Sequence, residues 1–171
     1  LASRGSLDSH LQRAQGKLNT AGLLQISHHV AEGVQYLHEM GVLHRDLAAR
    51  NVLVAEDGSC KLADFGLSRK VGQNETYVTL SRVPIRWTAP EVLLGSGATQ
   101  ASDCYSLAIL LWEIFSFARE RPYADIEDNL DVAPHVAGAG HRMSRPPGCP
   151  PRVFALIERL WKPDPDDRLL A

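Results

Sequence analysis

The sequence has few cysteines and no long apolar run. Its three cysteines, Cys60, Cys104 and Cys149, lie more than 40 residues apart. This spacing fits neither a disulfide framework nor a Cys-x-x-Cys metal site, so we expect reduced thiols and a cytoplasmic location. The longest apolar run, 107–112, is far shorter than the roughly 20 residues that a membrane span requires. Any membrane attachment, as in a receptor with this part on the intracellular face, is therefore expected from segments outside this chain.

Charge of neither sign dominates the sequence. It contains 18 Lys and Arg residues against 20 Asp and Glu residues, for a net charge of −2. This balance gives no global electrostatic reason to expect nucleic acid or an anionic membrane surface as a partner, and we predict no nucleic-acid partner. With 44% hydrophobic residues and 22% charged residues, 171 residues are enough for about one globular domain with a real core.

Helical periodicity is clear in the first 41 residues. Ser6 is placed to cap a short helix that ends at Gly16. A longer helix is predicted to begin at Thr20 and to stop at Gly41, which can supply a left-handed C-terminal residue. Its apolar residues recur every three or four positions: Leu23, Ile26, Val30, Val34, Leu37 and Met40.

A β-hairpin is predicted directly afterwards. The apolar runs 52–54 and 60–62 flank an Asp57-Gly58 pair, which favours a tight turn. Residues 67–88 are polar and lack sustained periodicity, which is typical of a mobile segment.

Helices return in the second half of the chain. Residues 102–117 are apolar on most faces, which predicts a buried central helix. An amphipathic helix is predicted after Pro150-Pro151, whereas 133–151 is rich in Pro and Gly and predicts mostly loop. The expected fold class is therefore α+β and mostly α-helical, with a small β-hairpin.

Three short motifs bring together the residue types of phosphoryl transfer. They are His-Arg-Asp-Leu-Ala-Ala-Arg-Asn at 44–51, Asp-Phe-Gly at 64–66 and Ala-Pro-Glu at 89–91. Asp46 could accept the proton of an attacking hydroxyl, while Asn51 and Asp64 could hold the magnesium ions of ATP. Because the predicted hairpin separates Asp46 from Asp64, it can bring both carboxylates to one cleft.

This ordered set resembles the catalytic domain of protein tyrosine kinases, specifically the C-terminal lobe. The resemblance implies a kinase-like lobe with the hairpin at the catalytic cleft, and ATP and Mg²⁺ as cofactors. The glycine-rich loop and the V-A-I-K-like lysine of the family are not found before His44. We therefore expect residues 1–171 to be a partial kinase domain, truncated at both ends, whose partner is a missing N-terminal lobe and which is inactive alone.

Two segments resemble tyrosine kinases rather than serine/threonine kinases. Leu-Ala-Ala-Arg follows Asp46, where serine/threonine kinases have a lysine at the position of Ala48. The Arg50 guanidinium could bind both the transferring phosphoryl group and the carboxylate of Asp46. Around Pro84, the sequence resembles the tyrosine-kinase segment in which proline forms a platform for the substrate tyrosine. The implied partners are protein substrates that contain tyrosine.

The resemblance also assigns roles outside the chemical step. His44 and Phe65 would stack in the column that aligns the two lobes. Tyr77 would be the phosphorylation site of the activation segment, with a phosphate that could recruit nearby arginines. Structural roles are implied for three further residues: Asp103 at the head of the central helix, and Glu91 and Arg168 as an ion pair.

Several positions depart from the family pattern. Tyr105 stands where tryptophan is usual and Ala108 where glycine is usual, which we interpret as repacking. Pro134 falls within the region that matches a substrate-docking helix, and an interior proline costs about 3 kcal/mol or more. We therefore predict that this helix is shortened or displaced. Leu169 follows Arg168 where proline is usual.

Two other functions stay open on the sequence alone. A native product of this size could be a non-catalytic decoy or interaction module, since half of the ATP site would be absent. A small-molecule phosphotransferase could share the Asp46 to Asn51 spacing, although the Asp-Phe-Gly and Ala-Pro-Glu motifs argue against it.

Overall fold

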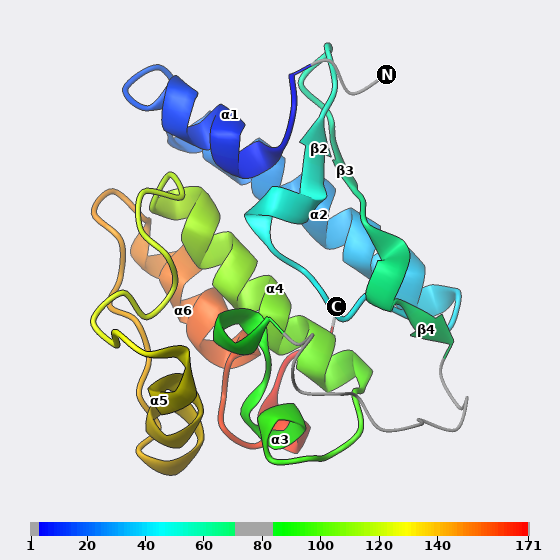
Figure 1. Cartoon of the computed structure of the whole chain (residues 1–171). Coiled ribbons are helices and arrows are strands. Elements are labelled where there is room, and N and C mark those ends of the chain that lie inside the picture. Colours follow the sequence, from blue (N-terminus) through cyan, green and yellow to red (C-terminus); the bar gives the residue numbers. More distant parts are fainter. Residues whose placement is uncertain (1–3, 71–83, 171) are drawn as a thin grey trace.

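The computed structural model describes residues 4–70 and 84–170. It is mostly helical, with two small two-stranded sheets (Figure 1). The α-helices are α1 (Leu7–Ala14), α2 (Thr20–Glu39), α3 (Pro90–Leu93), α4 (Gln100–Phe115), α5 (Asn129–Ala133) and α6 (Pro151–Leu160). The strands are β1 (Val42–Leu43), β2 (Val52–Val54), β3 (Cys60–Leu62) and β4 (Arg69–Lys70). The predicted α+β, mostly α-helical fold class is confirmed.

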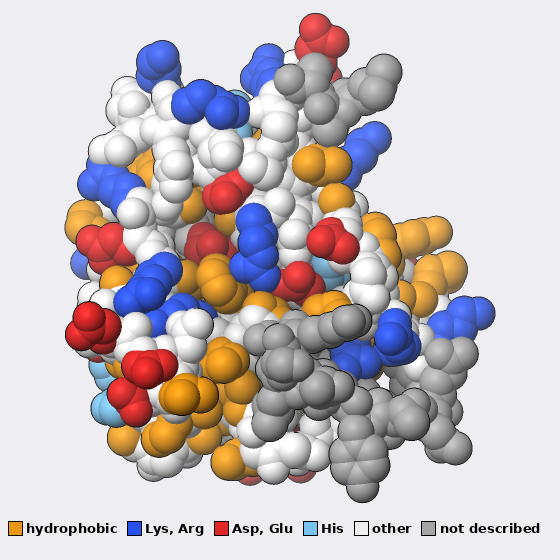
Figure 2. Space-filling view, viewed as in Figure 1, with side chains coloured by type: hydrophobic (Ala, Val, Ile, Leu, Met, Phe, Trp, Pro, Cys, Tyr) orange, Lys and Arg blue, Asp and Glu red, His pale blue; other side chains and the backbone are white. Residues whose placement is uncertain are grey.

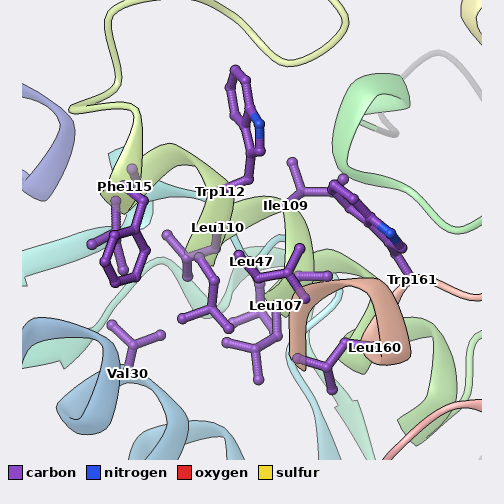
Figure 3. Close-up of a cluster of buried hydrophobic side chains, with 14 of the residues drawn as sticks. Val30, Leu47, Leu107, Ile109, Leu110, Trp112, Phe115, Leu160 and Trp161 are labelled. Atoms are coloured by element: carbon purple, nitrogen blue, oxygen red, sulfur yellow. The ribbon is translucent and has the colours of Figure 1, made fainter. Parts of the chain in front are cut away.

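Helix α4 lies at the centre of the fold, with α2 and α6 packed against it (Figure 1). Every residue from Ser102 to Phe115 is buried, as expected for an apolar central helix. Figure 3 shows Leu47, from the loop before β2, among the α4 side chains Leu107 and Leu110. The residue next to Asp46 is therefore fixed in the hydrophobic core.

The ends of α4 differ from the expected 102–117. The helix begins two residues earlier because Thr99 and Ser102 form a capping box, each side chain bonding the backbone N–H of the other residue. It ends two residues earlier, and Phe117 has a left-handed φ of 59°.

The first two helices lie where the apolar periodicity predicts them. Ser6 is the N-cap of α1, but its side chain bonds Ser9 Oγ at 3.3 Å rather than a backbone N–H. The N-cap of α2 is Asn19, whose side chain accepts from Gly22 N at 3.0 Å. Gly41 has a φ of 67°, in agreement with the expected left-handed stop.

The predicted hairpin is confirmed and packs on α2. Strands β2 and β3 are antiparallel, with Val52 opposite Leu62 and Val54 opposite Cys60, and Gly58 in the turn has a φ of 84°. A Cβ on Gly33 would lie only 3.1 Å from Leu62 Cδ1, so the hairpin packs closely on the helix at this glycine. The β1–β4 pair, two residues on each strand, was not predicted.

Pro134 ends α5 without ending the helical path. A proline lacks the N–H of a regular α-helix, and α5 stops at Ala133, in agreement with the predicted shortening. The chain continues as a π-helical turn, η5 (Pro134–Gly138). The expectation of mostly loop over 133–151 is therefore wrong for 134–138.

The helices, surface charges and cysteines agree with the balanced charge and short apolar runs of the sequence. Among the described helices, none is long and apolar enough to cross a bilayer. On the face in Figure 2, basic and acidic side chains are interspersed rather than separated by sign. All three cysteines are buried, and burial raises the pKa of the Cys60 thiol to about 11.

Candidate active site

The loop before β2 brings three predicted site residues together. The Arg50 guanidinium forms an ion pair with the Asp46 carboxylate, whose side chain is 15% exposed. Asn51 donates from Nδ2 to the backbone oxygen of Asp46 at 2.9 Å. The short helix η1 (Ala49–Asn51) provides the turn that folds Asn51 back toward Asp46. A carboxylate, a cation and an amide are thus held at fixed positions.

The buried His44 imidazole connects this loop to the Asp-Phe-Gly segment. Its Nδ1 accepts from the backbone N–H of Asp46 at 3.3 Å, so Nε2 carries the proton and donates to Ala63 O at 3.0 Å. Its ring centroid lies 5.1 Å from that of Phe65, and the two rings are in contact at a tilt of 51°. Both ring nitrogens are already used, which favours a structural role over acid-base catalysis.

Asp103, at the start of α4, fixes the backbone just before Asp46. Its carboxylate accepts from the backbone N–H groups of His44 at 2.7 Å and Arg45 at 2.9 Å. Arg45 has a left-handed φ of 69°, a conformation that costs energy for a residue with a side chain. His38 Nε2 also lies 3.3 Å from this carboxylate. The buried aspartate therefore stabilises a strained turn at the site.

Asp64 lies on the exposed side of the same region. It has a left-handed φ of 59° and accepts from Gly66 N at 3.3 Å, which begins the short helix η2 (Phe65–Leu67). Its backbone neighbour Ala63 bonds Asn51 O at 2.8 Å, so the hairpin links Asp64 to Asn51.

The oxygen ligands at this site fit magnesium bound to ATP. Asn51 uses its amide nitrogen internally, which leaves its oxygen for a cation, and the Asp64 carboxylate is exposed. Within 4–70 and 84–170, no group of three or more His, Cys, Asp or Glu side chains could hold a metal alone. Mg²⁺ usually takes one or two protein oxygens together with phosphates and water, and Asn51 and Asp64 could provide these two oxygens.

Pro84 lies at the start of the short helix η4 (Ile85–Trp87). Its carbonyl accepts from Trp87 N at 2.9 Å and from Thr88 Oγ1 at 3.0 Å. The Arg50 guanidinium lies 4.3 Å from the Trp87 ring centroid, within cation–π range. The segment that carries Pro84 is thereby joined to the residue paired with Asp46. Tyr77 lies outside the described residues.

Comparison with known proteins identifies the family. The family model for protein tyrosine and serine/threonine kinases matches residues 1–170. The chain belongs to this kinase family. It is 40% identical to megakaryocyte-associated tyrosine-protein kinase of Mus musculus over 167 residues, which cover 97% of this chain and 32% of the relative. Ephrin type-A receptor 6 of Mus musculus is 40% identical over 96% of this chain and 16% of its own length.

A third relative is tyrosine-protein kinase Srms of Mus musculus, 40% identical over 98% of this chain and 34% of the relative. The chain therefore spans at most about a third of these curated relatives. It is a segment of a tyrosine kinase catalytic domain, and its mostly helical fold is that of the C-terminal lobe.

Glu113 is a buried charged residue of this kinase lobe that the sequence motifs did not predict. Glu113 is 6% exposed, and its Oε2 accepts from Ala49 N and Trp87 Nε1, both at 2.9 Å. It thus connects α4 to the catalytic loop and to η4. Burial raises the pKa of Glu113 to about 7, against the hydrogen bonds from Trp87 and Ala49 and the nearby charge of Arg50. The signal in the sequence was a carboxylate within the apolar part of this helix, at 107–115.

We expect Glu113→Gln to change how stability depends on pH. The folded lobe keeps the proton on Glu113 up to about pH 7, whereas the unfolded chain releases it near 4.5. The wild-type free energy of unfolding therefore falls as the pH rises across this window. Glutamine is neutral throughout, so the free energy of unfolding of Glu113→Gln should rise by roughly 3 kcal/mol relative to the wild type between pH 4.5 and 7.5. Urea unfolding across this pH range measures the difference.

Glu158→Gln is the matched control for this change, because Glu158 is an exposed glutamate on α6. For Glu158→Gln, the difference in free energy of unfolding from the wild type should stay constant across the pH range. A constant difference for Glu113→Gln as well would contradict a raised pKa for Glu113.

The Glu91–Arg168 ion pair expected from the sequence closes the lobe beneath α4. Arg168 Nη1 and Nη2 donate to the two Glu91 oxygens at 2.6 and 2.8 Å. The Arg168 guanidinium lies 5.2 Å from the ring centroid of Tyr105, whose hydroxyl bonds that of Tyr123 at 2.7 Å. The tyrosine that replaces the usual tryptophan is thus fully buried with its hydroxyl paired.

Proposed function

We propose that the protein carrying this chain transfers the γ-phosphoryl group of Mg-ATP to tyrosine hydroxyls of protein substrates. The Asp46–Arg50 ion pair carries this proposal, because it places the cation where tyrosine kinases, rather than serine/threonine kinases, are expected to have it. The names of the three relatives support the same substrate class.

In the proposed reaction, Asp46 accepts a hydrogen bond from the substrate hydroxyl and takes its proton as the phosphoryl group transfers. Arg50 keeps this carboxylate oriented through their ion pair. Asn51 and Asp64 would hold Mg²⁺, which when bound neutralises charge on the ATP phosphates. Pro84 would support the ring of the substrate tyrosine.

We propose that residues 1–171 form a partial kinase domain that works with a nucleotide-binding lobe. The Phe65 ring, 49% exposed and next to His44, offers the surface on which that lobe would stack. Tyr77 is the proposed phosphorylation site. The proposed location is the cytoplasm, or the inner face of the membrane if the full-length protein is a receptor.

Substrate class is tested with paired peptides that differ only in the acceptor residue. The full-length protein, incubated with Mg-ATP, should phosphorylate the tyrosine peptides at least about a hundredfold faster than their serine versions. A site shaped for the long tyrosine side chain leaves the hydroxyl of the shorter serine out of reach of Asp46. Mass spectrometry of the products gives both rates. A folded protein that modifies neither peptide would favour the non-catalytic decoy, and equal rates would contradict the tyrosine assignment.

A further inference from the structure

Arg86 is a buried cation whose side chain makes five hydrogen bonds to one loop. It lies in η4, two residues after Pro84, and is 4% exposed. Nε donates to Asn129 Oδ1 at 2.7 Å. The backbone acceptors are Pro122 and Tyr123 for Nη1, at 2.9 and 2.6 Å, and Ile126 and Glu127 for Nη2, at 2.8 and 3.3 Å.

These bonds use all five N–H donors of the guanidinium. Every acceptor belongs to 122–129, the loop that leads into α5 together with the first residue of that helix, and four of the five are backbone carbonyls. The shape of this loop, rather than one acidic partner, is therefore what Arg86 recognises. A lysine keeps the charge but has a single nitrogen, so it cannot reach acceptors spread over eight residues.

The segment 84–88 is also bonded to α4. Trp87 donates to Glu113 and its carbonyl accepts from Ser106 Oγ at 2.7 Å, so η4 is fixed to α4. η4 also packs against α5, and these elements adjoin in the lower part of Figure 1. Arg86 is the link that sets the distance between the Pro84 platform and the loop entering α5.

We infer that Arg86 is a positioning residue for the peptide substrate: it locks the Pro84 platform to the 122–129 loop, so that the two form one rigid docking surface. This inference rests on the proposed tyrosine kinase function. It concerns the binding of the protein substrate and not ATP, since the Arg86 side chain bonds none of the residues that we assign to the phosphoryl-transfer site.

The test is a kinetic comparison of Arg86→Lys with wild type, using full-length protein and a random copolymer of glutamate and tyrosine as substrate. We expect the KM for the copolymer to rise about tenfold, while kcat and the KM for ATP stay within about twofold, because the lost docking contacts contribute equally to binding in the ground state and in the transition state. Asn129→Ala removes one of the five bonds at the exposed first residue of α5. It should raise the KM for the copolymer about two- to threefold. This variant still tests the inference if Arg86→Lys does not fold.

Arg142→Lys is the matched control. Arg142 also donates to backbone carbonyls, those of Trp161, Val136 and His141, but to none in 84–88 or 122–129. It should lower Tm without changing the KM for the copolymer. With an active wild type, two results would overturn the inference but not the proposed function. One is an equal rise in the KM of this control, and the other is an unchanged KM in both Arg86→Lys and Asn129→Ala. A wild-type protein that leaves the copolymer unmodified would overturn the proposed function and the inference with it.

Discussion

Replacing Asp46 with asparagine should lower the kcat of the full-length kinase by about a thousandfold, the usual contribution of a positioned general base. An amide can accept a hydrogen bond from the substrate hydroxyl but cannot take its proton. The change also removes the ion pair with Arg50 and leaves that guanidinium without its carboxylate. Steady-state assays with a tyrosine peptide at saturating ATP measure the loss.

The fold should survive this substitution because the loop holds Asp46 by its backbone. Its N–H donates to His44 Nδ1, and its carbonyl accepts from Asn51 Nδ2. Asparagine keeps both groups, so Tm should change little. Asp57→Asn is the control: the Asp57 carboxylate accepts from Ser59 in the exposed hairpin turn, and an amide oxygen can do the same. Full activity in Asp46→Asn would show that Asp46 does not act as the general base.

Local patterns predicted most elements of the fold. The spacing of apolar residues located α2 and α4 to within two residues, and Asp57-Gly58 located the turn of the β2–β3 hairpin. The ends were harder to predict because capping depends on side-chain geometry, as with the Thr99–Ser102 capping box that starts α4 two residues early. The β1–β4 pair is too short to leave any alternation in the sequence.

Long-range polar contacts could not be predicted in the same way. Glu113 bonds residues 64 and 26 positions away in the sequence, so only its isolation in an apolar helix hinted at burial. Arg86 is harder still, because backbone carbonyls leave no trace in residue identity. The residues that hold the catalytic loop and the platform in place are therefore revealed by the structure, whereas the chemical groups were visible in the motifs.

Removing the Arg168 side chain should produce the largest loss of stability. Arg168→Ala leaves the Glu91 carboxylate, 16% exposed, without its bidentate partner. It also frees the carbonyls of Lys162, Ala101 and Pro163, which the guanidinium bonds at 2.7 to 3.1 Å. Breaking one member of a buried pair costs about 3 to 5 kcal/mol, so the urea midpoint should fall sharply.

The exposed pair of Lys162 and Asp167 gives the control within the same segment. Their charged atoms lie 3.9 Å apart and both side chains are well exposed, so Asp167→Asn should cost less than about 1 kcal/mol. In the double variant Glu91→Gln, Arg168→Ala, the unpaired charge is gone, and part of the stability should return. A loss in Arg168→Ala no greater than in Asp167→Asn would show that the pair does not hold the Ala-Pro-Glu segment against the end of the chain.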